Sequence, residues 1–260
     1  MRFLTPIALI VIGAASASAQ DYTAPRSATV PASRAQRIEV VARAGSLRID
    51  GRNGARDVSV RGTARASSRA ALEEVKLIAE QRGGTIYIEA DIPENRDWRD
   101  DDNQSLDLTI EVPSDLPIDV KDGSGDLEIR NVGALELSDG SGEAVIEHVG
   151  GDLRVSDGSG TVRINDVRGD VSVTDGSGLL DIRDVEGGVE IGSKGSGELR
   201  ITSVAKSVRV RAKGSGTVDV SHVGGDFVVE RKASGDIQYS DVKGRVDVPE
   251  RRHGRRSWSS

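Results

Sequence analysis

Carboxylates recur at regular intervals along the middle of the 260-residue chain, each at the start of the tetrapeptide DGSG. They are Asp122, Asp139, Asp157 and Asp175. Carboxylate oxygens are ligands that calcium prefers. Gly-rich turns repeating about every 18 residues are also typical of the calcium-binding nonapeptide roll, GGxGxDxUx. The four aspartates are therefore candidate calcium ligands.

The match to the calcium-binding roll is incomplete. Aligning DGSGDLEIR on it places Gly123 and Gly125 at its glycines and Ile129 at its apolar position, but Leu127 stands where the ligating Asp belongs. The later copies have Ala144, Val162 and Leu180 there. Stacked aspartates repel one another unless each caps its own turn or a cation neutralises them. We favour self-capped turns and expect no cofactor, with calcium as the alternative.

A second acidic cluster lies in the insertion PENRDWRDDDNQS, residues 93–105. Asp100, Asp101 and Asp102 follow Trp98 there. This combination is a candidate site for a cation or a sugar. We favour a solvated loop over such a site.

The seven turn serines offer hydroxyl groups but no catalytic arrangement. Nucleophilic catalysis needs one activated hydroxyl with a base beside it, and equivalent repeats supply none. We expect each serine to hydrogen-bond local backbone and hold its turn. His148 and His222 occupy the same repeat position four copies apart, so they cannot form a pair, and we expect exposed turn residues. No catalytic residue is predicted, and the chain is not expected to be an enzyme.

The tetrapeptide belongs to a repeat that indicates the fold. DGSG occurs four times, KGSG follows at 194–197 and 213–216, and KASG at 232–235, with steps of 17, 18, 18, 19, 19 and 19 residues. A valine follows the first residue of every turn by ten positions. Between these markers apolar residues alternate with polar ones, which predicts short half-buried strands. Two strands in so few residues leave no room for a crossover helix. The pattern therefore predicts an all-β parallel β-solenoid (β-helix), with two short strands per rung of about 18 residues.

The inward and outward positions of this solenoid follow from the alternation. The inward columns are nearly all aliphatic, with Ala144, Phe227 and Tyr239 as exceptions. Tyr239 stands where a last rung lacks a partner, so its hydroxyl should reach water. The outward columns carry opposite charges on neighbouring rungs, which favours in-register stacking: Arg163, Asp181, Arg200 and Asp219 in one, and Glu136, Arg154, Glu190 and Arg209 in the other.

The remaining segments define the predicted domain limits. Residues 1–19 have the charged start, short apolar core and A-x-A site of a signal peptide. Residues 20–36 are expected to be a flexible leader, 37–118 an irregular N-terminal β part of the solenoid, 119–250 the regular seven-rung body, and 251–260 a basic disordered tail. Residues 45–50 and 56–62 resemble one degenerate rung. In 67–91, Ser67 or Ser68 could cap a short helix through Glu74, and Gly83-Gly84 could turn a hairpin.

Composition narrows the choice of partners. The chain has no cysteine, which excludes disulfides and thiolate metal sites. Its formal net charge of −7 makes nucleic acid an unlikely partner, and we expect none. Beyond the signal peptide no apolar stretch approaches membrane-spanning length. The change from Asp to Lys along the repeat gives an acidic and a basic end, which could favour head-to-tail self-association.

The run IxVPxDLPIDVKDGSGDLEIxNV (110–132) and the DGSG copies after it resemble the bacterial β-strand-repeat domains known as "putative adhesins". The resemblance covers roughly residues 37–250. It implies an exported cell-envelope protein with a β-helical body and supplies no catalytic or binding residues.

Together these features predict an exported, non-enzymatic protein of the periplasm, cell surface or extracellular space. Its role would be adhesion or scaffolding, with envelope polysaccharide or a surface protein as partner. The alternatives are a polysaccharide-active β-helix enzyme, which would need charged residues clustered beside a groove, and a calcium-binding β-roll-like module.

Overall fold

The computed structural model describes residues 22–93 and 104–249, and their fold is an all-β solenoid with one short helix. The N-terminal elements are β1 (Tyr22–Pro31), β2 (Arg37–Val41), β3 (Leu47–Arg52), β4 (Asp57–Ala66), α1 (Arg69–Glu74), β5 (Lys76–Arg82), β6 (Thr85–Asp91), β7 (Ser105–Pro113), β8 (Ile118–Asp122) and β9 (Leu127–Val132). The regular coils continue with β10 (Leu135–Val149), β11 (Leu153–Val167), β12 (Val171–Val185), β13 (Val189–Val204), β14 (Val208–Val210), β15 (Val218–Val223), β16 (Phe227–Val229), β17 (Ile237–Val242) and β18 (Val246–Asp247).

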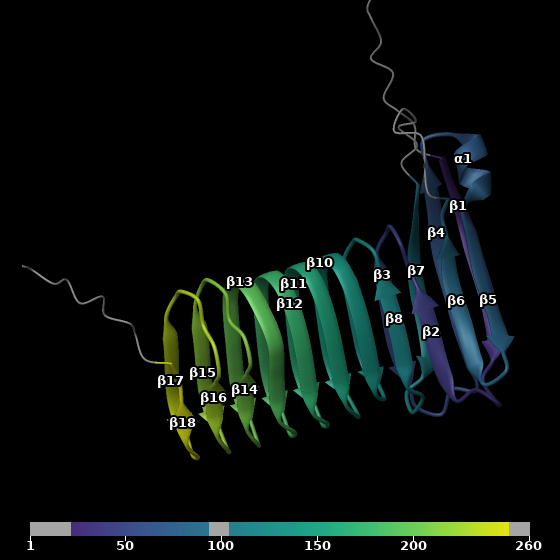
Figure 1. Cartoon of the computed structure of the whole chain (residues 1–260). Helices are drawn as coiled ribbons and strands as arrows, with labels where there is room; N and C mark the ends of the chain where they lie inside the picture. Colours follow the sequence, from purple (N-terminus) through teal and green to yellow (C-terminus); the bar gives the residue numbers. More distant parts are fainter. Residues whose placement is uncertain (1–21, 94–103, 250–260) are drawn as a thin grey trace, which may run out of the picture.

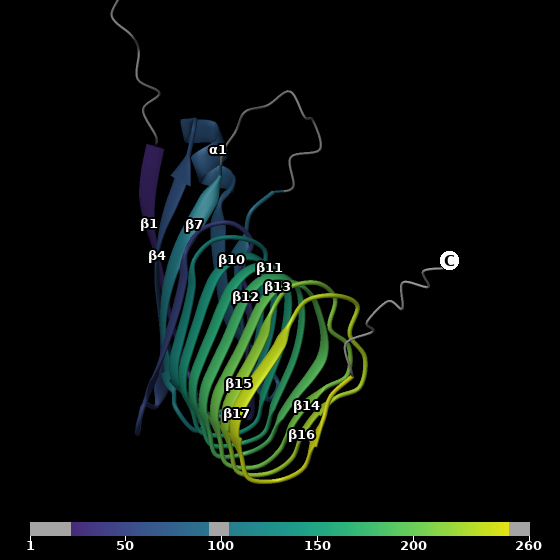
Figure 2. The same ribbon diagram turned by 90° about the vertical axis from the view of Figure 1, so that its left-hand side faces the viewer.

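Successive coils stack in parallel and in register, as the repeat predicts. Leu137 pairs with Val155, and Val155 with Val173 on the next coil. Each coil runs along one sheet, bends at its tetrapeptide and returns along a second sheet, so that the coils lie side by side in a row (Figures 1 and 2). The prediction of a parallel β-solenoid is confirmed.

The predicted pairs of short strands merge in four coils. The Asp, Ser and second Gly of neighbouring tetrapeptides also pair in register, as in Asp139 with Asp157 and Ser141 with Ser159. Ladder hydrogen bonding therefore continues around the bend, and each of β10–β13 is one strand of 15 or 16 residues. The last coils keep two separate strands each.

The repeat length changes from 18 to 19 residues at a single irregularity in the pairing of β12 with β13. The pairing of β12 with β13 shifts between Val173 and Thr174, so that Val173 faces Ile191 but Thr174 faces Ser193. Gly192 is thus the extra residue, and its insertion forms a bulge just before the first Lys turn.

The core between the two sheets is a thin aliphatic layer. The inward Val, Leu and Ile side chains of every coil are buried, apart from those of the last coil. Phe227 is also fully buried, and its ring packs at 6.0 Å between centroids on that of Tyr239, which is 50% exposed. The last coil pairs with the preceding one only, so the predicted exposure of Tyr239 is confirmed.

The first rung differs from the one expected from the sequence. Strand β3 pairs in parallel with β9, and β2 pairs in parallel with β8, so residues 37–52 form the first coil. Residues 56–62 fall mostly in β4, which runs antiparallel to β7. The suggested rung of 45–50 with 56–62 is therefore wrong, since its second segment joins a different, antiparallel layer.

The predicted flexible leader is wrong for residues 22–31. They form β1, which pairs antiparallel with β4 over its whole length, from Tyr22 opposite Ala66 to Pro31 opposite Asp57. The sequence of β1 lacks the alternation of apolar and polar residues that predicts a strand. Most of its small and polar side chains face solvent, and Val30 alone in this strand is buried. Backbone pairing with β4 orders the segment.

The helix and hairpin readings of residues 67–91 are confirmed. Ser68 is the N-cap of α1, and its hydroxyl accepts a hydrogen bond from the Ala71 backbone N–H at 3.1 Å. Strands β5 and β6 form an antiparallel hairpin that turns at Gly83-Gly84. With β1, β4 and α1 this hairpin closes the N-terminal end of the solenoid (Figure 1).

The charged outer columns are in register, but their ion pairs differ from the expected ladder. Arg163, Asp181 and Arg200 do lie opposite one another on successive coils. Asp181, however, accepts two hydrogen bonds from Arg183 of its own strand, at 3.0 and 2.6 Å, and Arg200 bonds Glu198 at 2.7 Å. Neighbours two residues apart share a face of the strand, so they compete with the ladder partners.

Several predictions concern residues that the structure does not describe. The signal peptide 1–19 and the tail 251–260 lie outside the described residues, as does most of the insertion 93–105. Among the residues that are described, no helix is long and apolar enough to cross a membrane.

Candidate functional site

The four turn aspartates point into the solenoid rather than toward solvent. Asp122, Asp139, Asp157 and Asp175 are only 8, 5, 6 and 2% exposed. They pair in register with one another across β8, β10, β11 and β12. We call these four residues the acidic column. It begins beside Ala42, whose place in the first coil corresponds to theirs, and it ends at Lys194.

The carboxyl oxygens of the acidic column lack well-formed hydrogen bonds. Both carboxyl oxygens of each member are buried, and none has a hydrogen bond of good geometry. Burial and the neighbouring Asp139 raise the pKa of Asp122 to about 7, although the Gly123 backbone N–H opposes the shift. Burial, Asp175 and Asp139 raise the pKa of Asp157 to about 7. Burial also raises the pKa of Asp139, against the backbone N–H groups of Gly140 and Ser141. Turn backbone N–H groups thus cap Asp122 and Asp139, as self-capping predicts, but burial has the larger effect on both carboxyls.

Lysines continue the column beyond Asp175. The ammonium of Lys194 lies 2.7 Å from the Asp175 carboxylate and donates to the Gly178 carbonyl at 2.9 Å, with both side chains fully buried. Lys213 is buried too and donates to the Gly197 carbonyl at 3.2 Å. Burial and the charge of Lys194 lower the pKa of Lys213. The change from Asp to Lys thus forms a buried ion pair at the boundary.

The aspartates do not form a metal centre in the described chain. No group of three or more His, Cys, Asp or Glu residues in 22–93 and 104–249 is arranged to hold a metal ion. The other candidates, Asp100, Asp101 and Asp102, lie outside the described residues.

The serine column faces outward. The turn serines pair in register, as in Ser159 with Ser177, and are at least partly exposed. No hydrogen bond from these seven hydroxyls to protein is found among the described residues, so the expected bonds to turn backbone are not present. Water is their available partner. Seven equivalent, solvated hydroxyls contain no activated nucleophile.

The histidines lie on the opposite corner of the coil, where each of the seven regular rungs has a non-glycine residue of positive φ. His148 and His222, with φ of 58° and 56°, are exposed as predicted. Ser203, His222 and Asp241 occupy this corner on successive coils. His222 Nε2 lies 3.9 Å from the Asp241 carboxylate, and no hydrogen bond joins Ser203 to His222 in the described structure. The three side chains therefore do not form a catalytic triad.

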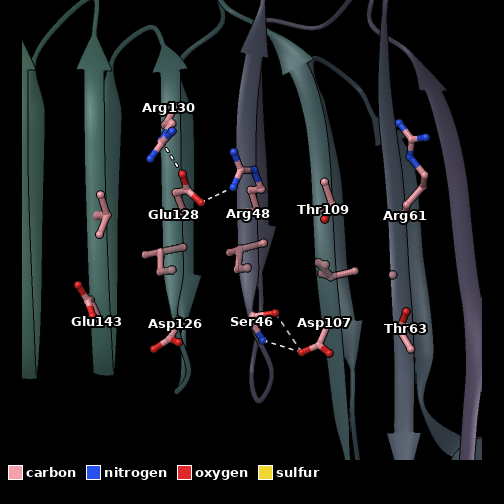
Figure 3. Close-up of a pocket in the computed structure, with 15 residues that line it drawn as sticks. Ser46, Arg48, Arg61, Thr63, Asp107, Thr109, Asp126, Glu128, Arg130 and Glu143 are labelled. Atoms are coloured by element: carbon pink, nitrogen blue, oxygen red, sulfur yellow. Dashed lines mark hydrogen bonds and ion pairs between the residues drawn. The ribbon is translucent and has the colours of Figure 1, made fainter.

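A shallow groove lies on the outer face of the second sheet. It crosses β4, β7, β3, β9 and β10, has a volume of about 640 Å³, and is lined by Arg48, Arg61, Thr63, Asp107, Thr109 and Glu128 among others. We call it the outer furrow. Figure 3 shows these side chains on adjacent strands, all projecting from the same face. It lies where the antiparallel N-terminal strands meet the first parallel coils.

The charged groups of the outer furrow hold one another in place. Glu128 pairs with both Arg48 and Arg130. Asp107 accepts from the Ser46 backbone N–H at 2.9 Å and from Arg65 at 3.1 Å. Burial alone would raise the pKa of Asp107, but these donors lower it below its usual value. The Asp107 carboxylate therefore stays ionised near neutral pH.

Two threonines lie beside these charged side chains: Thr109 on β7, and Thr63 on β4 opposite Asp107 (Figure 3). Thr109 is exposed and pairs across the sheet with Arg48 on one side and Arg61 on the other. Such a surface can exchange hydrogen bonds with a polar ligand along several strands. Sequence reasoning missed the furrow because it depends on β4 and β7 lying beside β3, and no repeat signal marks that neighbourhood.

Comparisons with known proteins find distant similarity in structure only. No family model matches the chain, and no curated protein matches it. A "putative adhesin" from Bacteroides fragilis is 15% identical, with a TM-score of 0.48 over 89% of this chain and 98% of that one. A "putative cell adhesion protein" from Clostridium sporogenes is 14% identical, with a TM-score of 0.35 over 88% and 99%. A "putative lipid binding protein" from Parabacteroides distasonis is 16% identical, with a TM-score of 0.39 over 85% and 96%.

Proposed function

We propose that the protein is a non-enzymatic, exported β-solenoid of the bacterial cell envelope, and that its outer furrow binds envelope polysaccharide in an adhesive or scaffolding role. The observation that supports this proposal is the furrow itself. It is an open hollow built on five hydrogen-bonded strands and lined by paired charged side chains and threonine hydroxyls.

A rigid sheet favours binding because little conformational entropy is lost when the ligand docks. The furrow runs across the strands, along the stacking direction, so an extended polymer can contact several rungs at once. Hydroxyls and paired charges are suitable hydrogen-bonding partners for sugar hydroxyls. Export is supported by the pattern of residues 1–19.

The enzyme alternative is less well supported by the described residues. Carbohydrate cleavage by general acid and base needs a carboxyl group with a raised pKa beside the substrate. The carboxyls with clearly raised pKa values among the described residues belong to the acidic column, which is buried between the sheets. They cannot reach a polymer on the outer face.

The proposal is tested by blocking the furrow and measuring binding to purified, insoluble envelope polysaccharide in a sedimentation assay. Thr109→Trp places a large ring at the centre of the furrow. Ser172→Trp is the matched control, since Ser172 is exposed on the outer face of the other sheet. We expect the first variant to lose at least about tenfold in affinity and the second to bind like the native chain.

Equal affinity of both variants, or failure of the native chain to sediment with any envelope polysaccharide, would refute the proposed site. Release of shortened sugar chains during the assay would instead support the polysaccharide-active alternative.

A further inference from the structure

The acidic column combines three properties that no structural role in the solenoid requires. Its carboxyls are buried, they are stacked in register, and their oxygens have no hydrogen bond of good geometry to a donor. A buried carboxylate without a donor is costly. Asp175 avoids that cost through Lys194, which leaves Asp122, Asp139 and Asp157 without a partner cation.

A proton bound to one carboxylate can supply the missing hydrogen-bond donor, because it converts that carboxylate into a carboxyl O–H group. The side chains of Asp139 and Asp157 lie within hydrogen-bonding reach of each other. Two carboxylates in this position are both acceptors and repel each other. If one takes up a proton from the solvent, its new O–H group can donate to the other, and the pair becomes satisfied.

We propose that the acidic column binds protons as a unit and acts as a buried pH sensor, so that the solenoid is more stable with protons bound to the column than with the column ionised.

The groups that act on the column are its own members and the residues at its ends. Asp122 interacts with Asp139, and Asp157 with Asp139, Asp175 and Lys194. Beside Asp122 the first coil contributes only Ala42, which carries no charge. Within each coil the inward neighbours on both sides of the aspartate are aliphatic, as Leu137 and Ala144 are for Asp139. The column is therefore an isolated titrating system whose members share apparent pKa values.

The direction of the pH effect follows from the raised pKa values. An aspartate with a pKa of about 7 in the folded chain and 3.8 as its ordinary value binds more protons when folded than when unfolded. The free energy of unfolding therefore falls as pH rises from about 4 to about 7 and stays low above that range. The stabilisation is fully present only below the ordinary value, and it is lost through the window in which the column ionises.

The first test is a direct titration of the full chain. Side-chain carboxyl carbons of aspartate are followed by ¹³C NMR between pH 4 and pH 9. We expect two or more aspartates to titrate near pH 7, which Asp157→Asn would change in number or midpoint. Ionisation of all aspartates by pH 5 would overturn the proposal.

The second test measures thermal unfolding of three chains at pH 5 and pH 8. The native chain should melt at a lower temperature at pH 8. Asp157→Asn supplies a permanent amide donor to Asp139, so it should weaken this pH dependence and raise the melting temperature at pH 8 by at least about 2 °C. Asp219→Asn, at an exposed position on the outer face, should keep the native dependence. A native melting temperature that does not fall, or an unchanged slope in Asp157→Asn, would contradict the sensor. If Asp157→Asn does not fold, the titration of the native chain decides alone.

Discussion

At the scale of single residues, the turn glycines are needed for two reasons: they adopt a positive φ, and they have no Cβ. Gly142 has a φ of +138°, but a Cβ there would also lie 1.9 Å from the carbonyl oxygen of Gly125 on the preceding coil. The same close approach recurs at Gly160 and Gly178. The coils stack so tightly at this corner that the neighbouring backbone occupies the space of a side chain.

We therefore expect Gly142→Ala to destabilise the protein by more than the cost of its φ alone, which is about 1–2 kcal/mol for an L-residue in the left-handed region. Gly54→Ala is the matched control, because Gly54 has a φ of +74° but no atom within 4 Å of its Cβ position. Urea unfolding of both variants gives the comparison. A loss for Gly142→Ala no larger than that for Gly54→Ala would contradict the steric explanation.

The alternation of buried and exposed positions in the sequence predicts that the turn aspartates point inward, although aspartate is a polar residue type that is usually exposed. Asp122 follows the buried Val120 by two residues, and Asp139 follows Leu137 by two. Period-two alternation places both on the inner face. Aspartate is rarely buried without a partner, so residue type points to an exposed turn while the alternation points inward. Residue types alone could not show that the bend remains part of the ladder.

At the scale of the element, strand β13 joins the acidic and basic parts of the column. Its Lys194 neutralises Asp175 of β12 at 2.7 Å, and the bulge at Gly192 precedes it directly. A buried ion pair adds little net stability compared with an apolar pair, but removing one partner leaves an uncompensated charge.

Lys194→Met should consequently destabilise the protein by about 3–5 kcal/mol at pH 8, since the Asp175 carboxylate loses its partner. The double variant Asp175→Asn, Lys194→Met should recover most of that loss, because no unpaired charge remains. Chemical denaturation of the single and double variants measures both effects. Equal stability of the native chain and Lys194→Met would show that the pair does not neutralise the column.

The elements predicted best from the sequence are those with a repeated pattern. The sequence repeat correctly predicts the coils from β8 to β18. The sequence wrongly predicts a flexible leader where β1 lies, and it predicts a first rung from the wrong pair of segments. Both errors concern pairing between strands far apart in sequence, such as Val30 with Val58 or Leu47 with Leu127. The outer furrow depends on the same pairings, so no local pattern could have predicted it.

At the scale of the whole molecule, the coils are interchangeable units whose stability depends on contacts with their neighbours. Deleting residues 140–157 joins Asp139 to Gly158 and removes one coil, since the step between Asp139 and Asp157 is 18 residues. Asp139 then pairs with Asp175, and every inner column stays continuous.

We expect this shortened chain to fold, with native-like circular dichroism and a rod shorter by about 4.8 Å. Deleting residues 140–148 instead removes half a coil, sends each following strand to the wrong sheet and should prevent folding of the body. Small-angle scattering and circular dichroism distinguish the two chains. Failure of the full-coil deletion to fold would show that the coils are not independent units.

The two ends of the rod differ in a way that bears on how the chain folds. The hairpin β5–β6, α1 and the β1–β4 pair close the N-terminal end, while no other described element covers the last coil, in which Tyr239 is 50% exposed. The closed end is also made first during synthesis, and N-terminal units generally fold first. Each finished coil then presents two strand edges on which the next coil can form. We expect assembly to be vectorial, with the N-terminal layer as the template on which each later coil forms.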